Sequence, residues 1–197
     1  MNSNKSYSFT GMEIQSSPES ILQRIKAIPW WEWLLMLILT VIPLIGGSIA
    51  GSQINTDIYK NDVIQKPSWA PSPKVFPIIW PILYILMGFA SYLVWKQGGG
   101  LNQATVPALF LYAVQLGLNF AWTPVFFNAG LFCGGLCVIA ILLALIFACM
   151  VVFIPSSWIA TLLLLPYIIW VSIATALNYD ITALNGCFGP NTTHSLP

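Results

Sequence analysis

Five long apolar stretches dominate the chain, and short polar or proline-containing segments separate them. They cover residues 33–51, 76–95, 107–126, 131–154 and 158–179. Each comes close to, or exceeds, the roughly 20 residues that an α-helix needs to cross a bilayer. The pattern therefore predicts an all-α membrane protein: a bundle of five transmembrane helices with a long ordered loop between the first and the second.

Glycines and prolines interrupt two of these stretches. In the first, Pro43 precedes a glycine-rich segment in which Gly47 and Gly51 lie one helical turn apart. Small residues at this spacing let two backbones approach closely in lipid, so Gly47 and Gly51 are predicted to pack against another helix or a second copy of the chain. Pro43 predicts a kink or an unwound turn, and Pro166 predicts an interruption of the fifth stretch.

The loop between the first two stretches carries prolines at positions 67, 71, 73 and 77. Proline fixes φ and removes a backbone donor, which disfavours a helix over residues 66–76. An ordered loop with this proline and tryptophan content indicates a lid over a cavity between helices, with Trp69 in the lid. The alternative is an ordinary connection at the membrane surface, anchored by Trp69 and Lys74.

Polar and aromatic side chains recur on one side of three predicted helices. On the third they follow a spacing of three and four residues: Tyr112, Gln115, Asn119, Trp122 and Phe126. A stripe of amides, a phenol and an indole is not expected to face lipid, so it is predicted to face the bundle interior. This stripe can form hydrogen bonds between helices, line a ligand-binding site, or do both. The other two stripes are Trp80, Tyr84, Met87 and Ser91 on the second helix, and Tyr167, Trp170, Ala174 and Asn178 on the fifth.

Composition supports lipid as the solvent and narrows the function. The 197 residues are 57% hydrophobic and 7% charged, against about 25% charged in an ordinary globular domain. The net charge of +1 offers no electrostatic basis for binding nucleic acid. The predicted spans hold no Asp, Glu, Lys, Arg or His, which counts against proton relays, ion pumps and charge-coupled transport.

The sequence also shows no constellation for catalysis or metal binding. There is no nucleophile–base pair, phosphate-binding loop or metal-ligand cluster, so we expect no catalytic residues, no metal site and no obligatory cofactor. Cys133, Cys137 and Cys149 fall inside the fourth stretch and Cys187 stands alone near the C-terminus, so no disulfide is predicted.

Polarity divides the chain into three regions. Residues 1–30 form a polar extension that ends in a short amphipathic segment, residues 31–185 form the five-helix membrane domain, and residues 186–197 form a flexible tail. Five spans place the two termini on opposite sides of the membrane. Basic residues do not settle the orientation, because four lie on the N-terminal side and three on the other.

The predicted interior is aromatic and apolar, with a few neutral hydrogen-bonding groups. These groups are the side chains of Tyr84, Gln115, Asn119 and Asn178. Such an interior suits a large, planar, mostly apolar molecule.

Several motifs, in order and at matching spacing, resemble the translocator protein family, also known as the peripheral benzodiazepine receptor or tryptophan-rich sensory protein family. The resemblance covers about residues 40–185. It is carried by Pro43 with Gly46-Gly47, by Gln65-Lys66-Pro67-Ser68-Trp69-Ala70-Pro71, by Trp80, Leu83-Tyr84, Met87-Gly88, Ser91-Tyr92 and Val94-Trp95-Lys96, by Gln115-Leu116, Leu118-Asn119, Trp122, Pro124 and Phe126-Phe127, and by Pro166-Tyr167, Trp170, Ala174-Thr175 and Leu177-Asn178-Tyr179.

The resemblance implies a membrane bundle, often homodimeric, whose pocket is closed by the loop after the first helix. It implies binding of porphyrins, including protoporphyrin and haem, and in animal members also of cholesterol and benzodiazepine-type ligands. The pocket positions carried over from the family are Gly51, Trp80, Asn119, Trp122, Trp170, Ala174 and Leu177, to which the interior stripe adds Tyr84. Trp69 falls in the lid motif.

Two departures from the family pattern bear on the ligand. Where the family often has a Trp and an Asp early in the fourth helix, this chain has Gly134 and Val138, which leaves that wall of the pocket more open. The basic residue that ends the animal cholesterol motif is missing after Leu177-Asn178-Tyr179, so sterol binding through that motif is not expected.

Three hypotheses follow for the function. The first is a membrane-embedded protein that binds porphyrins and related hydrophobic ligands and transports, senses or scavenges tetrapyrroles, sterols or other lipids. The second is light-dependent breakdown of porphyrin involving Trp122 or Trp170. The third is an adaptor that recruits a membrane partner through Gly47 and Gly51. The likeness of residues 65–71 to animal members favours the mitochondrial outer membrane, with the endoplasmic reticulum, the Golgi or a bacterial membrane as alternatives.

Overall fold

The computed structural model describes residues 26–52 and 64–188. The chain forms two units, Met1–Leu34 and Leu35–Pro197, and the bundle analysed below belongs to the second. Most of the predicted polar extension, residues 53–63 of the long loop and the last residues of the tail lie outside the described residues.

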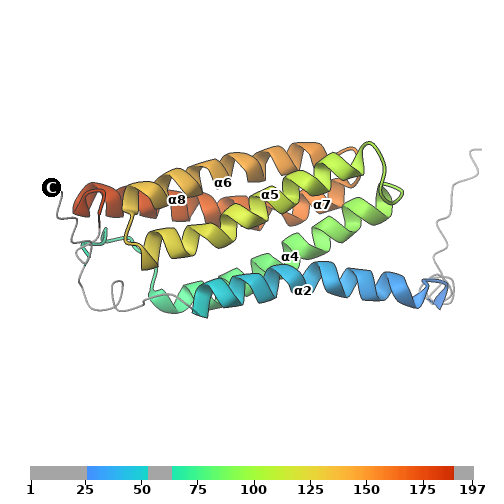
Figure 1. Ribbon diagram of the computed structural model, residues 1–197, viewed down its shortest axis with the longest axis horizontal. Coiled ribbons are helices and arrows are strands. Elements are labelled where there is room, and N and C mark those ends of the chain that lie inside the picture. The colour runs from blue at the N-terminus through green and yellow to red at the C-terminus, as the bar shows by residue number, and fades with distance from the viewer. Residues whose placement is uncertain (1–25, 53–63, 189–197) are drawn as a thin grey trace, which may run out of the picture. The chain divides into compact units, whose positions relative to one another are not determined.

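Five helices of the described part are long and apolar enough to cross a membrane, as the hydrophobic pattern predicts. They pack without strands into an all-α bundle (Figure 1). The first span is α2 (Trp30–Ser52), and the second is α4 (Phe76–Gln97) after the 3-10 turn η1 (Pro73–Val75). The third is α5 (Thr105–Thr123) with its π-helical continuation η2 (Pro124–Asn128), the fourth is α6 (Phe132–Phe153), and the fifth consists of α7 (Trp158–Leu163) and α8 (Leu165–Asn185).

Prolines change the helical geometry of two of these spans. Pro124 has no N–H to donate, and from there the chain winds as a π-helix in which the Ala129 N–H donates to the Pro124 carbonyl at 2.9 Å. The predicted interruption at Pro166 is confirmed, since α7 ends at Leu163 and α8 begins at Leu165. At Pro43, where the sequence predicts a kink or an unwound turn, the helix does not unwind, because α2 continues through it.

The Pro43 region is stabilised by close contact with α4. Proline at position 43 cannot bond to the carbonyl of Leu39 one turn earlier. Gly88 of α4 packs directly on this part of α2: a Cβ at Gly88 would lie 2.6 Å from the Leu39 carbonyl oxygen and 2.7 Å from Thr40 Cα. Only glycine permits this approach, which is a common way for helices to associate in lipid.

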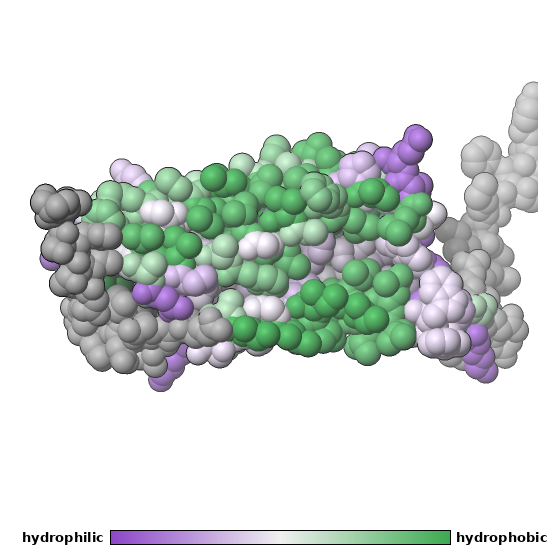
Figure 2. Space-filling model, in the orientation of Figure 1, coloured by the Kyte–Doolittle hydropathy of each residue, from purple (hydrophilic) through white to green (hydrophobic). Residues whose placement is uncertain are grey.

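Helix α6 has extensive contacts with α5 and α8, while α4 packs on α7 (Figure 1). The buried faces supply a continuous apolar core that includes Met87, Val94, Ile139 and Phe153. The outward faces are equally apolar, and Figure 2 shows hydrophobic residues covering most of the visible helical surface. A surface of this kind is expected where lipid is the solvent.

The absence of a disulfide, predicted from the sequence, is wrong. Cys133, in the first turn of α6, is bonded to Cys187, 54 residues later. Gly186 ends α8 with a φ of 79°, which glycine adopts readily, and turns the chain back toward the start of α6. The first residues of the predicted flexible tail are therefore held against the bundle, and Cys187 is not alone.

The contact between α2 and α4 can be tested by replacing Gly88 with alanine. Overpacking of this kind typically costs about 1–3 kcal/mol, which exceeds the roughly 1 kcal/mol that alanine gains over glycine inside a helix. We expect a lower midpoint of thermal unfolding in detergent. The matched control is Gly117→Ala on α5, where an added Cβ has no neighbour within 4 Å. The control should keep or raise the midpoint, and equal effects of the two substitutions would contradict the close approach.

Candidate functional site

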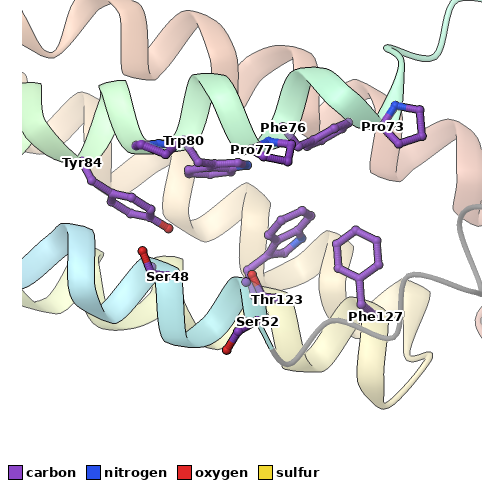
Figure 3. Close-up of a pocket in the computed structure, with 13 residues that line it drawn as sticks. Ser48, Ser52, Pro73, Phe76, Pro77, Trp80, Tyr84, Thr123 and Phe127 are labelled. Atoms are coloured by element: carbon purple, nitrogen blue, oxygen red, sulfur yellow. The ribbon is translucent and has the colours of Figure 1, made fainter.

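A cavity of about 480 Å³ lies between α2, α4 and the junction of α5 with η2 (Figure 3). This volume is typical of small-molecule sites. The lining comes from Gly47, Ser48, Gly51 and Ser52 on α2, from Pro73, Phe76, Pro77, Trp80, Pro81 and Tyr84 on η1 and α4, and from Trp122, Thr123 and Phe127 on α5 and η2.

The glycines of α2 have two different roles in this cavity. A Cβ at Gly47 would overlap the Tyr84 ring, so this glycine lets Tyr84 lie directly against α2. A Cβ at Gly51 would meet nothing within 4 Å, so this glycine leaves open space. Within the chain, Gly47 serves helix packing and Gly51 contributes to the cavity.

Aromatic rings of α4 and α5 form one wall. The Trp80 ring stacks on Tyr84 with centroids 5.7 Å apart and lies 6.2 Å from Trp122. Trp122 in turn meets Phe127 edge to face at 5.6 Å. Such a wall offers a flat apolar ligand several rings to stack against, each contact contributing about 1 kcal/mol beyond area burial.

The opposite side of the cavity carries small hydroxyl groups. In Figure 3, Ser48 of α2 faces Tyr84, and Ser52 and Thr123 also belong to the lining. The Ser52 hydroxyl donates to the Ile49 carbonyl at 2.9 Å. Charged side chains are missing from the lining formed by the described residues. The site can therefore combine stacking with a few neutral hydrogen bonds.

A chain of buried hydrogen bonds fixes Tyr84 from behind. Its hydroxyl donates to Asn119 Oδ1 at 2.8 Å, Asn119 Nδ2 donates to the Tyr167 hydroxyl at 2.8 Å, and that hydroxyl donates to Gln115 Oε1 at 3.0 Å. The four side chains come from α4, α5 and α8 and are all buried. The hydrogen bonds among these four side chains fix the orientation of the Tyr84 ring.

Trp122 is held in a similar way. Its Nε1 donates to Asn178 Oδ1 at 3.2 Å, and Asn178 Nδ2 donates to the Ala174 carbonyl at 2.8 Å. The side-chain amides of Asn119 and Asn178, one layer further from the cavity, thus orient the rings of Tyr84 and Trp122 in the wall.

The structure divides the eight predicted ligand-binding residues into two groups. Gly51, Trp80, Tyr84 and Trp122 line the cavity together. The other four lie behind this first layer: Asn119, Trp170, Ala174 and Leu177, all buried in the bundle.

Among the second group, Trp170 is separated from the cavity by one ring. It meets Phe76 edge to face at 5.6 Å, and Phe76 lines the cavity. Trp170 also borders an apolar groove on the other side, formed with Ile79, Leu83 and Ile169 of α4 and α8. Its Nε1 is buried without a hydrogen-bond partner in the part of the chain that the structure describes.

The described part of the predicted lid is fastened to the end of α8. Gln65 and Asn185 form a reciprocal pair, in which the Gln65 N–H donates to Asn185 Oδ1 and Asn185 Nδ2 donates to the Gln65 carbonyl, both at 2.8 Å. Trp69 Nε1 donates to Asp180 Oδ2 at 2.9 Å. From the described loop residues only Pro73 reaches the cavity lining, so the lid role of Trp69 stays a prediction.

Sequence reasoning did not find the hydroxyl side of the cavity or two of its rings. These residues are Ser48, Ser52, Thr123, Phe76 and Phe127. Ser48 and Ser52 lie one turn apart in an otherwise apolar helix, a signal that could have marked an inward face. Phe76 and Phe127 carry no such signal, because an apolar ring in an apolar helix is equally at home in lipid.

Comparison with known proteins identifies related sequences over most of the chain. The model of the TspO/MBR family matches residues 34–184. The translocator protein of Sus scrofa is 36% identical over 150 residues, which cover 76% of this chain and 89% of that protein. Protein CrtK of Rhodobacter capsulatus is 39% identical over 127 residues, covering 63% and 77%. The tryptophan-rich protein TspO of Chlorobaculum tepidum is 42% identical over 120 residues, covering 61% and 75%.

The support of Tyr84 can be tested by replacing Asn119 with alanine. The substitution leaves the Tyr84 hydroxyl without its acceptor, and a buried unpaired group costs about 1–3 kcal/mol, while the Tyr167 hydroxyl loses one partner and keeps Gln115. We expect a clearly lower thermal unfolding midpoint in detergent. The control, Ser172→Ala, removes an exposed hydroxyl that bonds only within its own helix and should have little effect. Equal midpoints for the two variants would show that the network does not stabilise the bundle.

Proposed function

Because the chain belongs to the TspO/MBR family, we propose that its cavity binds porphyrins, such as protoporphyrin and haem, and related hydrophobic ligands. In this proposal the protein transports, senses or scavenges tetrapyrroles, or sterols and other lipids, from within the membrane. The observation that carries it is the wall of Trp80, Tyr84 and Trp122 in a cavity without a charged residue among its described lining.

The chemistry of the two walls supports a flat ligand with polar groups on its edge. Stacked rings on one side favour an aromatic macrocycle or another planar apolar body. The hydroxyls of Ser48 and Thr123 on the other side can bond to neutral or anionic oxygen atoms at the edge. At the end of the cavity, Pro73 precedes the exposed Lys74, a cation that a carboxylate of the ligand could approach.

Trp170 marks a direction in which the site can extend. A buried N–H without a partner carries a cost of about 1–3 kcal/mol, which a hydrogen-bond acceptor would offset. If a ligand displaces the Phe76 ring, Trp170 and its neighbour Ala174 border the enlarged space. The proposed site therefore includes Trp170, Ala174 and Leu177, although the cavity itself stops at Phe76.

Binding accounts for the glycines of α2 better than an adaptor role does. Gly47 is occupied by Tyr84 of the same chain, and Gly51 opens to the cavity. A partner helix would therefore not find Gly47 available for close packing. Integral membrane insertion through several helices follows from the family and the apolar spans, and the mitochondrial outer membrane remains our proposal for the compartment.

Titration of the purified full-length protein with protoporphyrin tests the site. We expect saturable quenching of tryptophan fluorescence and, for Trp80→Ala, an affinity more than tenfold lower, because the substitution removes the stacking surface. Gly51→Leu should also weaken binding by filling open space. Trp158→Ala is the control, since Trp158 is exposed at the start of α7 and far from the lining residues in sequence.

The Trp170→Ala variant tests how far the ligand-binding site extends. A loss comparable with that of Trp80→Ala indicates that the ligand reaches past Phe76, whereas a small loss restricts the ligand to the cavity as it stands. An unchanged affinity for Trp80→Ala would refute the site assignment.

We further propose binding without chemical conversion of the porphyrin. The illuminated complex is then expected to keep the absorption spectrum of the bound porphyrin over many minutes. A new bilin-like absorbance that is lost in Trp122→Phe would instead support a light-dependent breakdown activity, because Trp122 is buried and Trp80, the other indole of the wall, is only partly buried.

A further inference from the structure

We propose that the Cys133–Cys187 disulfide is a redox switch that controls how firmly the loop before α4 is held to the end of α8. In the oxidised chain the disulfide fixes the end of α8, and α8 in turn fixes the described loop residues 64–72. A thiol reductant that opens the bond loosens both. The effect on the loop is independent of any ligand, whereas its consequence for ligand exchange rests on the proposed function.

The disulfide is the strongest connection between α6 and the residues that follow α8. Helix α8 ends at Asn185, two residues before Cys187. Just beyond the helix, Leu131 and Phe188 form an isolated antiparallel bridge. The Cys133 N–H donates to the Cys187 carbonyl at 3.4 Å, which is long for a hydrogen bond. The covalent bond therefore carries most of this attachment.

The described loop is held by the last turns of the same helix. Gln65 and Asn185 exchange two hydrogen bonds of 2.8 Å, and Trp69 Nε1 donates to Asp180 Oδ2 at 2.9 Å. Ile64, next to the Gln65 pair, is only 2% exposed and belongs to the apolar core. The position of the loop thus depends on a well-ordered end of α8.

A single residue, Gly186, connects the disulfide to the loop contact. It separates Cys187 from Asn185, which is the last residue of α8. Helix ends fray unless other contacts hold them. Opening the disulfide therefore releases the chain next to the helix end, and the bonds between Asn185 and Gln65 loosen first. Asp180 lies further inside the helix, so its bond to Trp69 is less affected.

The disulfide lies where a reductant can reach it, because Cys187 is exposed and Cys133 is partly exposed. A thiolate of a dithiol reductant attacks Cys187 Sγ, the S–S bond breaks, and Cys133 leaves as a thiolate that takes up a proton. The second thiol of the reductant then resolves the mixed disulfide and releases Cys187 as a thiol. Two electrons and two protons pass to the protein, and the dithiol becomes a disulfide.

The loop leads directly to the cavity. Pro73 follows the described loop residues and belongs to the cavity lining. Once Gln65 is released, residues 66–72 and η1 move more freely, so we expect a ligand to enter and leave faster. The rings of Tyr84 and Trp122 are held by buried hydrogen bonds to Asn119 and Asn178, so the stacking wall is kept.

Hydrogen exchange followed by mass spectrometry tests the switch on the purified full-length protein without ligand. We expect the amides of residues 64–72 to exchange severalfold faster after treatment with excess dithiothreitol than in the oxidised protein. Exchange within α5 should be the same in both states. Because hydrogen exchange reports local opening, this pattern identifies a loosened loop on a folded bundle.

Three variants separate the disulfide from other effects of the reductant. Cys187→Ser should show fast exchange of the loop without reductant and no further response. Cys137→Ser is the matched control, since it removes a free thiol of α6 and should respond like the wild type. Asn185→Ala removes the loop contact while the disulfide stays intact, so the loop should exchange fast in the oxidised protein as well. This variant keeps the test valid if Cys187→Ser does not fold.

Two results of the exchange experiment would overturn the switch. One is equal exchange of residues 64–72 in the oxidised and the reduced wild-type protein. The other is a general rise of exchange in α5 on reduction, because the disulfide would then stabilise the whole bundle and not the loop.

Release of protoporphyrin tests the consequence for the cavity. Bound porphyrin is transferred to excess albumin, and the recovery of tryptophan fluorescence gives the release rate. We expect a severalfold faster release from the reduced protein and from Cys187→Ser than from the oxidised wild type. Equal rates would refute the link between the disulfide and the cavity. A protein that binds no porphyrin would refute the proposed function instead, and hydrogen exchange would still decide whether the switch exists.

Discussion

The structure depends on the requirement that polar groups inside a lipid-solvated bundle satisfy one another. Water does not compete for these groups, and each one left unpaired costs free energy. Tyr84, Asn119, Tyr167 and Gln115 meet this requirement with a continuous chain of hydrogen bonds across α4, α5 and α8. The same hydrogen bonds fix the Tyr84 ring in the cavity wall, so the stability of the bundle and the shape of the site have a common origin.

The position of α2 follows from a second property of lipid, the lack of a hydrophobic driving force between helices. Close backbone contact has to take its place, and glycines provide it at both helices: Gly46 and Gly47 receive the rings of Phe120 and Tyr84, and Gly88 receives the Leu39 carbonyl. The contacts stop at Gly51, where the space between the helices is open. The cavity exists because α2 is held closely along one part of its length and not along the next.

The sequence predicted the parts of this structure that a local pattern records: the length of an apolar stretch and the helical spacing of polar side chains. The five spans followed from apolar length, and the inward direction of Asn119 and Trp122 followed from amides and indoles at helical spacing. Phe76 and Phe127 could not be assigned, because an apolar ring satisfies both lipid and protein. The Cys133–Cys187 pair was missed for a different reason: a contact between residues 54 apart depends on how α6 and α8 are arranged, which no local pattern records.

The role of α8 explains why motifs shared with the family can lie outside the cavity. This helix contributes none of the lining residues among those described, yet it contacts residues of the wall that α4 and α5 form. Tyr167 supports Tyr84 through Asn119, Asn178 holds Trp122, and Trp170 packs on Phe76. Its last turns fasten the loop before α4 through Asp180 and Asn185, and the disulfide fixes the chain that follows. A substitution on α8 can therefore change the wall, the loop or both without removing a ligand contact, which makes this helix the scaffold against which the cavity is built.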